Sequence, residues 1–264
     1  MQHAPLTLYT FAMSHYSEKI RWTLDACHFD YKEVVMTPVA HLTPAWRMGG
    51  KGATTLPILR AEKAGGGKVL VQDSTAILRW LSRNLGPLPV LPVEPVLYDE
   101  VMSIEDRFDA IGQDVARLLY FTGFDQKEKI IEMWTRHASK GETRFIRLFY
   151  PLIKWGFKRR LKITAAQAKR SEQRIQQALA WLEGRLSDGR LFLVGGQLTV
   201  ADITAASLLA PLAAPKEHAV YGTPDYSRRM MPPGLAWRED RPGLAWVRRL
   251  YATQRLASSS QAAA

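Results

Sequence analysis

The residues with the clearest capacity for chemistry lie in a short polar turn that follows an apolar run near the N-terminus. Ser14 and Ser17 stand three residues apart in this turn, within YTFAMSHYSEKIRW (residues 9–22), and a predicted helix follows them. Two cysteines at this spacing would indicate thiol redox chemistry. Because both positions hold serine, a dithiol cycle is excluded here, and the chemistry that remains is hydrogen bonding by a hydroxyl group.

The two serines should have different roles at the start of that helix. Ser17 precedes Glu18 and a run of apolar residues at helical spacing, so it is the more natural N-cap of a helix expected over residues 18–27. This assignment leaves Ser14 without a structural role and favours it as the functional hydroxyl. The partial positive charge of the helix N-terminus would stabilise an anion held beside Ser14.

Two further features suit a ligand. Leu56-Pro57 opens a predicted strand, and a cis peptide bond there would leave the main chain of Leu56 free to pair with an extended peptide. Asp73 and Ser74 open the next predicted helix, where Asp73 could bind a ligand ammonium group and Ser74 a ligand carboxylate. Taken singly, an ordinary turn and an ordinary helix cap explain these residues better.

The elements that would position these residues follow from the hydrophobic pattern. A β-α-β unit is predicted over residues 6–36 and a β-β-α unit over residues 54–85. Four prolines within residues 86–95 are incompatible with a helix or a central strand and indicate a stiff linker. Amphipathic segments follow at residues 98–122, 126–150, 164–187, 199–212 and 241–254. We therefore predict an α/β domain over residues 1–85 and an all-helical domain over residues 96–264.

In this order and at this spacing, the features resemble the glutathione transferase superfamily. The resemblance rests on SHYSEKIRW (residues 14–22), TLPIL (55–59), QDSTAILRWL (72–81) and LTVADITAA (198–206). It implies a thioredoxin-like N-terminal domain that binds glutathione and a helical-bundle C-terminal domain. The last of these motifs matches a buried capping box of the family, in which Thr199 and Asp202 would satisfy the first turn of a central helix.

The resemblance also implies a role for each candidate residue. Ser14 takes the position at which related classes carry a catalytic serine or a reactive cysteine, so it should stabilise the thiolate of glutathione. Leu56, Pro57, Asp73 and Ser74 should bind glutathione itself. A hydroxyl that donates to the thiolate, together with the helix N-terminus, should lower the thiol pKa from about 8.5 by roughly one to three units.

Other positions of the family pattern are filled less clearly. His41, Arg47 and Lys51 lie in the segment where relatives hold the glycine carboxylate of glutathione, and the sequence does not choose among them. In the tyrosine-dependent classes the catalytic tyrosine corresponds to Thr10. Tyr9 is therefore one residue away and should face the opposite side of the strand.

Composition and charge limit the partners. The chain is 47% apolar and 23% charged, which is globular, and its formal net charge is +11. No nucleic-acid-binding motif accompanies the basic excess, which is densest over residues 154–170, so no nucleic-acid partner is expected. None of the six histidines forms a metal-binding pair, so no metal is expected. The single cysteine, Cys27, suits a reducing compartment, and no leader is recognisable, so a cytoplasmic protein is expected.

Two functions remain open. The first is an enzyme that conjugates or transfers glutathione to a small electrophile, which would bind between the sheet and the helical domain near residues 116–124. The alternative is a non-catalytic module of the same fold that docks a protein or membrane partner, for which the basic and aromatic segment 145–162 is the main support. Pro151 should break a helix there, so membrane association is disfavoured. The resemblance allows a homodimer.

Overall fold

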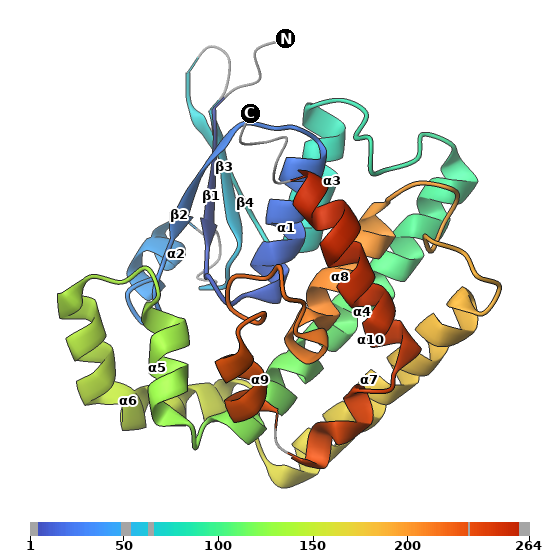
Figure 1. Cartoon of the computed structure of the whole chain (residues 1–264). Coiled ribbons are helices and arrows are strands. Elements are labelled where there is room, and N and C mark those ends of the chain that lie inside the picture. Colours follow the sequence, from blue (N-terminus) through green and yellow to red (C-terminus); the bar gives the residue numbers. More distant parts are fainter. Residues whose placement is uncertain (1–4, 49–53, 63–65, 232, 259–264) are drawn as a thin grey trace.

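The computed structural model describes residues 5–48, 54–62, 66–231 and 233–258 of the chain (Figure 1). The N-terminal part holds one four-stranded sheet in the order β2-β1-β3-β4. Its strands are β1 (Leu6–Thr10), β2 (Tyr31–Val35), β3 (Ile58–Glu62) and β4 (Lys68–Gln72). The pair β1/β2 is parallel, and the other two pairs are antiparallel, as the predicted β-α-β and β-β-α units require. The third strand begins at Ile58, four residues later than predicted.

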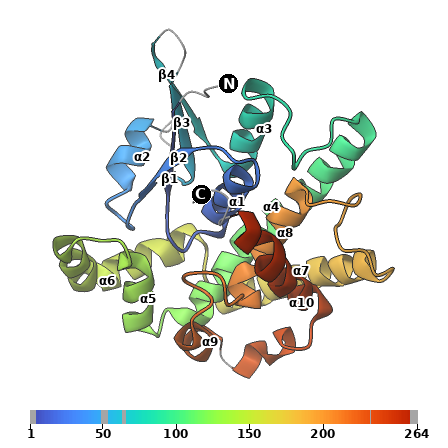
Figure 2. The same cartoon turned by 45° about the horizontal axis from the view of Figure 1, so that its top comes forward.

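Helices cover both faces of this sheet. Helices α1 (His15–Ala26) and α3 (Ser74–Asn84) lie on one face, and the short α2 (Leu42–Met48) lies on the other (Figures 1 and 2). Alternation along β1 separates the two faces, because Leu8 belongs to the main core while Tyr9 packs in a small apolar cluster near α2. The fold predicted for the N-terminal domain, thioredoxin-like α/β, is confirmed, and Tyr9 faces away from the α1 side as expected.

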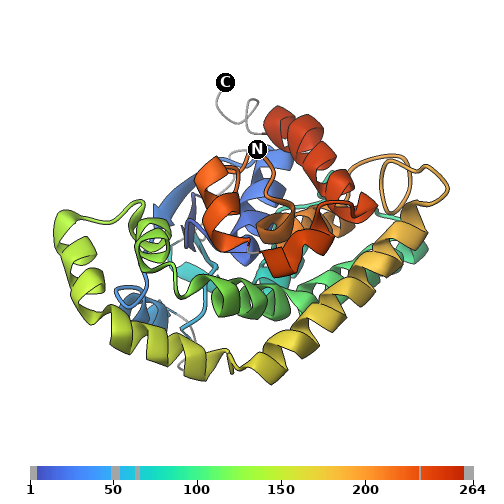
Figure 3. The same ribbon diagram turned by 60° about the horizontal axis from the view of Figure 1, so that its bottom comes forward.

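The rest of the described chain is helical. Its helices are α4 (Pro95–Gly123), α5 (Lys127–Thr135), α6 (Lys140–Arg160), α7 (Ala165–Leu186), α8 (Val200–Ala213), α9 (Pro224–Met230) and α10 (Pro242–Leu250), with a 3-10 helix (Pro233–Arg238) and a π-helical turn (Tyr251–Arg255). The apolar α8 is buried along its whole length at the centre, against α1, α4 and α10. The predicted helical bundle is thus confirmed, and α5 and α6 project at one end of it (Figure 3).

The capping box that the sequence indicated lies at the start of α8. Asp202 accepts hydrogen bonds from the main-chain N–H and the hydroxyl of Thr199, at 2.8 and 2.7 Å, and from the N–H of Leu193, at 2.7 Å. Burial raises the pKa of this carboxyl to about 6 in spite of these bonds. The central helix therefore begins at residues whose polar groups satisfy one another.

Two predictions about the segment that contains α5 and α6 were wrong. The amphipathic stretch 126–150 is two helices, because a capping box starts a new helix at Ser139: its hydroxyl oxygen accepts from the N–H of Glu142, and its own N–H donates to the Glu142 carboxylate. Pro151 does not break α6. Its buried neighbours Tyr150 and Ile153 anchor the helix on either side, so packing outweighs the loss of one main-chain hydrogen bond.

Between α3 and α4 the chain is non-helical from residue 85 to residue 94, and α4 takes Pro95 into its first turn. We propose the same division as the sequence indicated, with domains over residues 1–85 and 96–264 joined by a linker over residues 86–95. In the part of the chain that the structure describes, no helix is both long enough and apolar enough to cross a membrane.

Candidate functional site

The polar turn after β1 places Ser14 at the N-terminus of α1. The N–H of Ser14 donates to the carbonyl of Phe11 at 3.1 Å, and the Ser14 Oγ accepts from the N–H of Ser17 at 3.1 Å. Ser14 is therefore the N-cap of α1, and the prediction that Ser17 would cap a helix beginning at residue 18 was wrong. The Ser17 side chain is fully buried, and its Oγ accepts instead from the N–H of Phe11 at 3.4 Å.

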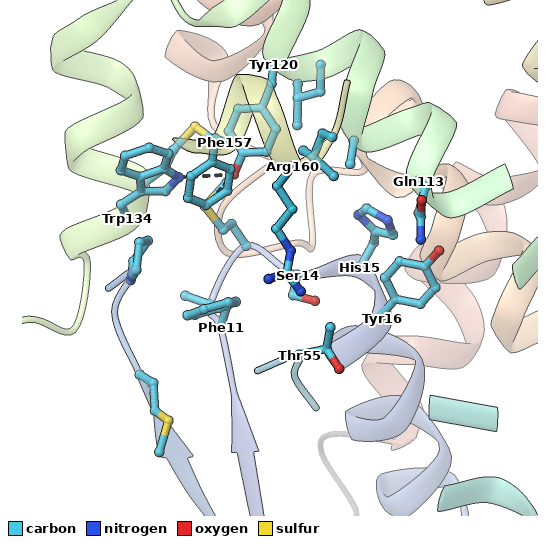
Figure 4. Close-up of a pocket in the computed structure, with 18 residues that line it drawn as sticks. Phe11, Ser14, His15, Tyr16, Thr55, Gln113, Tyr120, Trp134, Phe157 and Arg160 are labelled. Carbon is cyan, nitrogen blue, oxygen red and sulfur yellow. Dashed lines mark hydrogen bonds between the residues drawn. The ribbon is translucent and has the colours of Figure 1, made fainter. Parts of the chain in front are cut away.

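The capping bond leaves the hydroxyl hydrogen of Ser14 available. An N-cap oxygen uses a lone pair, so its own O–H can still donate, and accepting one bond polarises it toward a stronger donor. No described residue accepts a hydrogen bond from the Ser14 hydroxyl. The side chain lines a cavity of about 270 Å³ between the turn and the helical domain, the Ser14 cavity (Figure 4). One residue can thus cap α1 and donate into this cavity.

Aromatic side chains from three helices form the wall opposite the turn. Tyr120, Trp134 and Phe157 come from α4, α5 and α6 and all line the cavity (Figure 4). The rings of Trp134 and Phe157 stack with centroids 4.9 Å apart, and the Trp134 indole N–H donates to the Tyr120 hydroxyl at 3.0 Å. The sequence indicated only the contribution of residues 116–124, because nothing in it placed α5 and α6 beside the turn.

The two rings that follow Ser14 are structural. His15 is buried with its Nε2 at 3.0 Å from the carbonyl of Gly112, and burial lowers the pKa of the ring to about 4, so it is neutral and donates to that carbonyl. The Tyr16 hydroxyl donates to the carbonyl of Asp109 at 3.0 Å, and burial raises its pKa further above the usual value. A Cβ at Gly112 would lie 2.4 Å from the Tyr16 hydroxyl, so glycine permits this close approach of α1 to α4. Neither ring provides a base for Ser14.

The predicted ligand strand has the expected main-chain geometry. The Leu56-Pro57 peptide bond is cis. Among the described residues, none hydrogen-bonds to the N–H or C=O of Leu56, while the carbonyl of the preceding Thr55 accepts from the Gln72 side chain at 2.7 Å. Thr55 lines the Ser14 cavity, so the free main chain of Leu56 lies next to it.

Asp73 and Ser74 lie at the start of α3, but neither of them, nor Pro57, lines the Ser14 cavity. Asp73 is exposed, adopts φ +86°, and accepts from the N–H of Ala76 at 3.0 Å as the N-cap. The Ser74 side chain is buried, and its hydroxyl donates to Asp109 at 3.2 Å. Asp73 thus keeps an exposed carboxylate, whereas the Ser74 hydroxyl is already committed.

The three candidates for the glycine carboxylate are not equivalent. His41 is buried, and burial lowers the pKa of its ring to about 4; Nδ1 lies 3.3 Å from the carbonyl of Thr37. Arg47 is exposed in the last turn of α2. Lys51 lies outside the described residues. The described structure therefore makes Arg47 the exposed cation in this segment and His41 a neutral ring.

A buried ionic cluster behind the site had no signal in the sequence. The Lys19 ammonium group is fully buried on α1 and pairs with Glu105 and, at 2.7 Å, with Asp109, both on α4. It also donates to the hydroxyls of Ser74 and Thr75 at 3.2 and 3.3 Å. The cluster joins α1, α3 and α4, and so fixes both helix N-termini that face the predicted ligand.

A second cavity adjoins the first. It is a groove of about 600 Å³ between α6 and the loops that precede α2 and β3, and Phe11, Thr55, Phe157 and Arg160 line both cavities. We call it the α6 groove. Nothing in the sequence indicated a role for Arg160, which lies within the basic segment 154–170.

Cys27 lines neither of these two cavities. Burial raises the pKa of the half-buried Cys27 thiol to about 12, so it is protonated at neutral pH. In the described residues, no group of three or more His, Cys, Asp or Glu side chains could hold a metal ion.

Comparison with known proteins identifies the family. Residues 8–88 match the model of the glutathione S-transferase N-terminal domain, and residues 165–249 match that of the C-terminal domain. The chain belongs to the glutathione transferase superfamily. No curated protein matches it significantly, so the family models carry the assignment.

Solved structures of this superfamily share the fold at low sequence identity. A glutathione S-transferase from Methylobacterium radiotolerans, in complex with glutathione sulfonate, is 22% identical with a TM-score of 0.62, covering 97% of this chain and 94% of that one. A transferase from Methylobacillus flagellatus with glutathione bound is 15% identical, also at 0.62, with coverages of 97% and 98%. A maleylacetoacetate isomerase from Anaeromyxobacter dehalogenans, with bound dicarboxyethyl glutathione and citrate, is 21% identical at 0.57, with coverages of 99% and 95%.

Proposed function

We propose that this protein is a glutathione transferase that joins glutathione to a small electrophile, with the Ser14 hydroxyl stabilising the thiolate. The observation that carries the proposal is the position of Ser14: it caps α1, lines an aromatic cavity, and keeps a hydroxyl hydrogen that no described residue accepts. Membership of the superfamily and the glutathione seen in similar structures support the choice of thiol.

Glutathione would lie extended across the ends of the sheet. Its central main chain would pair with the free N–H and C=O of Leu56 beside cis-Pro57. The exposed Asp73 carboxylate would bind the γ-glutamyl ammonium group. Because the Ser74 hydroxyl already donates to Asp109, the neighbouring carboxylate would be held by main-chain N–H groups in the first turn of α3.

The reaction needs no general base from the protein. The thiol releases its proton to water, and the thiolate accepts a hydrogen bond from Ser14 beside the positive end of α1. A bond to a charged group contributes about 1.5–3 kcal/mol and the helix terminus about 0.3–1 kcal/mol, which bring the thiol pKa near neutrality. The sulfur then forms a bond to the electrophilic carbon, and the leaving group departs with the electron pair of the bond that breaks.

A second candidate function is a non-catalytic module of the same fold that docks a partner. The exposed apolar side chains of α6 support it, since Leu148 and Leu152 are 74% and 63% exposed. This candidate requires no glutathione binding, so one measurement separates the two.

Titration calorimetry with reduced glutathione tests the proposal. We expect saturable binding to the wild-type protein. Asp73→Asn should weaken it by about tenfold or more, because the ligand ammonium loses a charged partner while asparagine can still cap α3 and tolerate the positive φ. Asp99→Asn, at an exposed carboxylate on α4, is the matched control and should bind as the wild type does. An absence of heat at millimolar glutathione would favour the binding module.

A further inference from the structure

The α6 groove is large and apolar enough to hold a ligand of its own. Its volume of about 600 Å³ lies within the usual range for small-molecule sites. Apolar side chains of α6 form one side, and Val39, Leu42 and Leu56 form the other. The α6 residues of the groove are the aromatic and aliphatic side chains of the segment 145–162, to which the sequence assigned no definite role.

The exposed apolar side chains of α6 divide into two sets. Phe145, Phe149, Leu152 and Trp155 line the groove and are 46%, 39%, 63% and 59% exposed. Leu148 is more exposed still, at 74%, but does not line it. Most of the exposed apolar area of α6 therefore faces a concave site, which suits a small molecule better than the flat surface of a membrane.

Arg160 lies where the groove meets the Ser14 cavity. Its guanidinium extends from the end of α6 toward Ser14 and Thr55 (Figure 4). Among the described residues, it donates one hydrogen bond, to the Thr54 hydroxyl at 3.1 Å, and no carboxylate pairs with it. A cation without a counter-charge at the junction of two apolar cavities is a binding point for an anion.

We propose that the electrophilic substrate is an elongated apolar molecule that carries one anionic group, such as a carboxylate. Its alkyl or aryl body occupies the α6 groove, and its anionic group binds the Arg160 guanidinium. This arrangement holds the electrophilic carbon next to the anionic group and in front of Ser14. The reaction itself rests on the proposed function, but binding of the anion in the groove requires no glutathione.

Displacement of a fluorescent probe tests the proposal without glutathione. Nile red, which is neutral and apolar, would be bound to the protein and displaced with octanoate or octanamide, which differ in charge but little in shape. Wild-type protein should bind octanoate about tenfold more tightly than octanamide. Arg160→Met should abolish this preference, and its affinity for octanamide should stay within about twofold of the wild-type value. Lys158→Met removes an exposed cation two residues away that lines neither cavity, and should leave the preference intact.

A second pair of variants locates the apolar part of the ligand. Leu152→Glu should weaken Nile red and both competitors at least fivefold, because it places a charge in the groove. Leu148→Glu alters a more exposed leucine of the same helix outside the groove, and should have no effect. Equal effects of both variants would mean that the probe binds the outer surface of α6, and would overturn the proposal.

Two further results would overturn it. One is equal affinity of wild-type protein for octanoate and octanamide, and the other is retention of the octanoate preference by Arg160→Met. These outcomes are independent of the proposed function, because glutathione binding is measured in a separate calorimetric experiment. If the protein binds octanoate through Arg160 but does not bind glutathione, the proposed anion site stands and the proposed transferase function is contradicted.

Discussion

The two sides of the Ser14 cavity are built in opposite ways. On the α1 side, which comprises the turn and α1 (residues 11–26), the side chains of Ser17 and Lys19 are fully buried and hydrogen-bonded. On the α6 side, which continues into the α6 groove, Leu152 and Trp155 are more than half exposed, and Arg160 has no acidic partner in the described chain. The contrast teaches that one side holds Ser14 in a single geometry, as the proposed thiol site requires, while the other leaves apolar surface and a cation free for the proposed substrate.

The largest effect should come from the ionic cluster on the α1 side. Lys19→Met leaves Glu105 buried without its cation, which should lower the free energy of unfolding by about 3–5 kcal/mol. On the α6 side, Leu148→Ser should change it by no more than about 0.5 kcal/mol. Urea unfolding of both variants checks the comparison. Adding Glu105→Leu to Lys19→Met should recover part of the loss, and a Lys19→Met protein as stable as wild type would show that the cluster does not stabilise this side.

The next effect separates the capping role of Ser14 from its proposed role in catalysis. Ser14 caps α1 and Ser139 caps α6, so each side of the comparison has one serine N-cap. Ser14→Ala should lower turnover with an electrophilic aryl halide roughly ten- to a hundredfold, because the thiolate loses about 1.5–3 kcal/mol of stabilisation, while glutathione still binds. Ser139→Ala removes the equivalent cap of α6. Each variant should also lose about 1 kcal/mol of stability, but only Ser14→Ala should lose turnover. Equal turnover in both would remove Ser14 from the mechanism.

Ser14→Cys sharpens the same comparison. It places a sulfur beside the N-terminus of α1, where the thiol pKa falls. The variant should form a mixed disulfide with oxidised glutathione, seen as a mass increase that a reductant reverses. A variant that never acquires this mass would place residue 14 outside reach of the glutathione sulfur.

The last effect, seen only in acid, is a pH dependence of the free energy of unfolding that should belong to the α1 side. Burial alone would raise the pKa of Glu18, but the charges of Arg255 and Arg21 outweigh burial and lower it to about 2. The folded-state pKa is thus below the unfolded value, so this stabilisation is present above about pH 4.5 and is lost as the pH falls toward 2, by about 3 kcal/mol.

Unfolding measured between pH 2 and 6 checks the source of that dependence. Arg255→Met should flatten the acid side of the curve. Arg147→Met removes an exposed ion pair with Glu128 on the α6 side, 2.7 Å long, and should leave the slope as in wild type. Identical slopes in wild type and Arg255→Met would assign the acid sensitivity to other groups.

The fold was largely predictable because it follows from local patterns. Strand-like runs, the cis-proline position and the capping box at Thr199 and Asp202 each reside in a few consecutive residues. The boundary between α5 and α6 was missed because the Ser139 capping box interrupts a continuous amphipathic pattern. The break predicted at Pro151 is absent, because helix propensity does not include the packing of Tyr150 and Ile153.

The site was less predictable, since it depends on residues distant in sequence. Ser14 was found from its turn, but its role as N-cap was assigned to Ser17, because two hydroxyls three residues apart offer the same local signal. The partners of Lys19 lie 86 and 90 residues away, and no pattern in the sequence links them. The junction position of Arg160 likewise depends on how α6 packs across the turn.

The burial of Cys27 has a practical consequence for labelling. Its pKa of about 12 means that the thiol the chain already carries is almost never ionised at neutral pH. In a Ser14→Cys protein, an alkylating spectroscopic tag would therefore react at position 14 far faster than at Cys27. The native chain is already close to a cysteine-free background, so a single substitution suffices to attach a reporter that senses what enters the cavity.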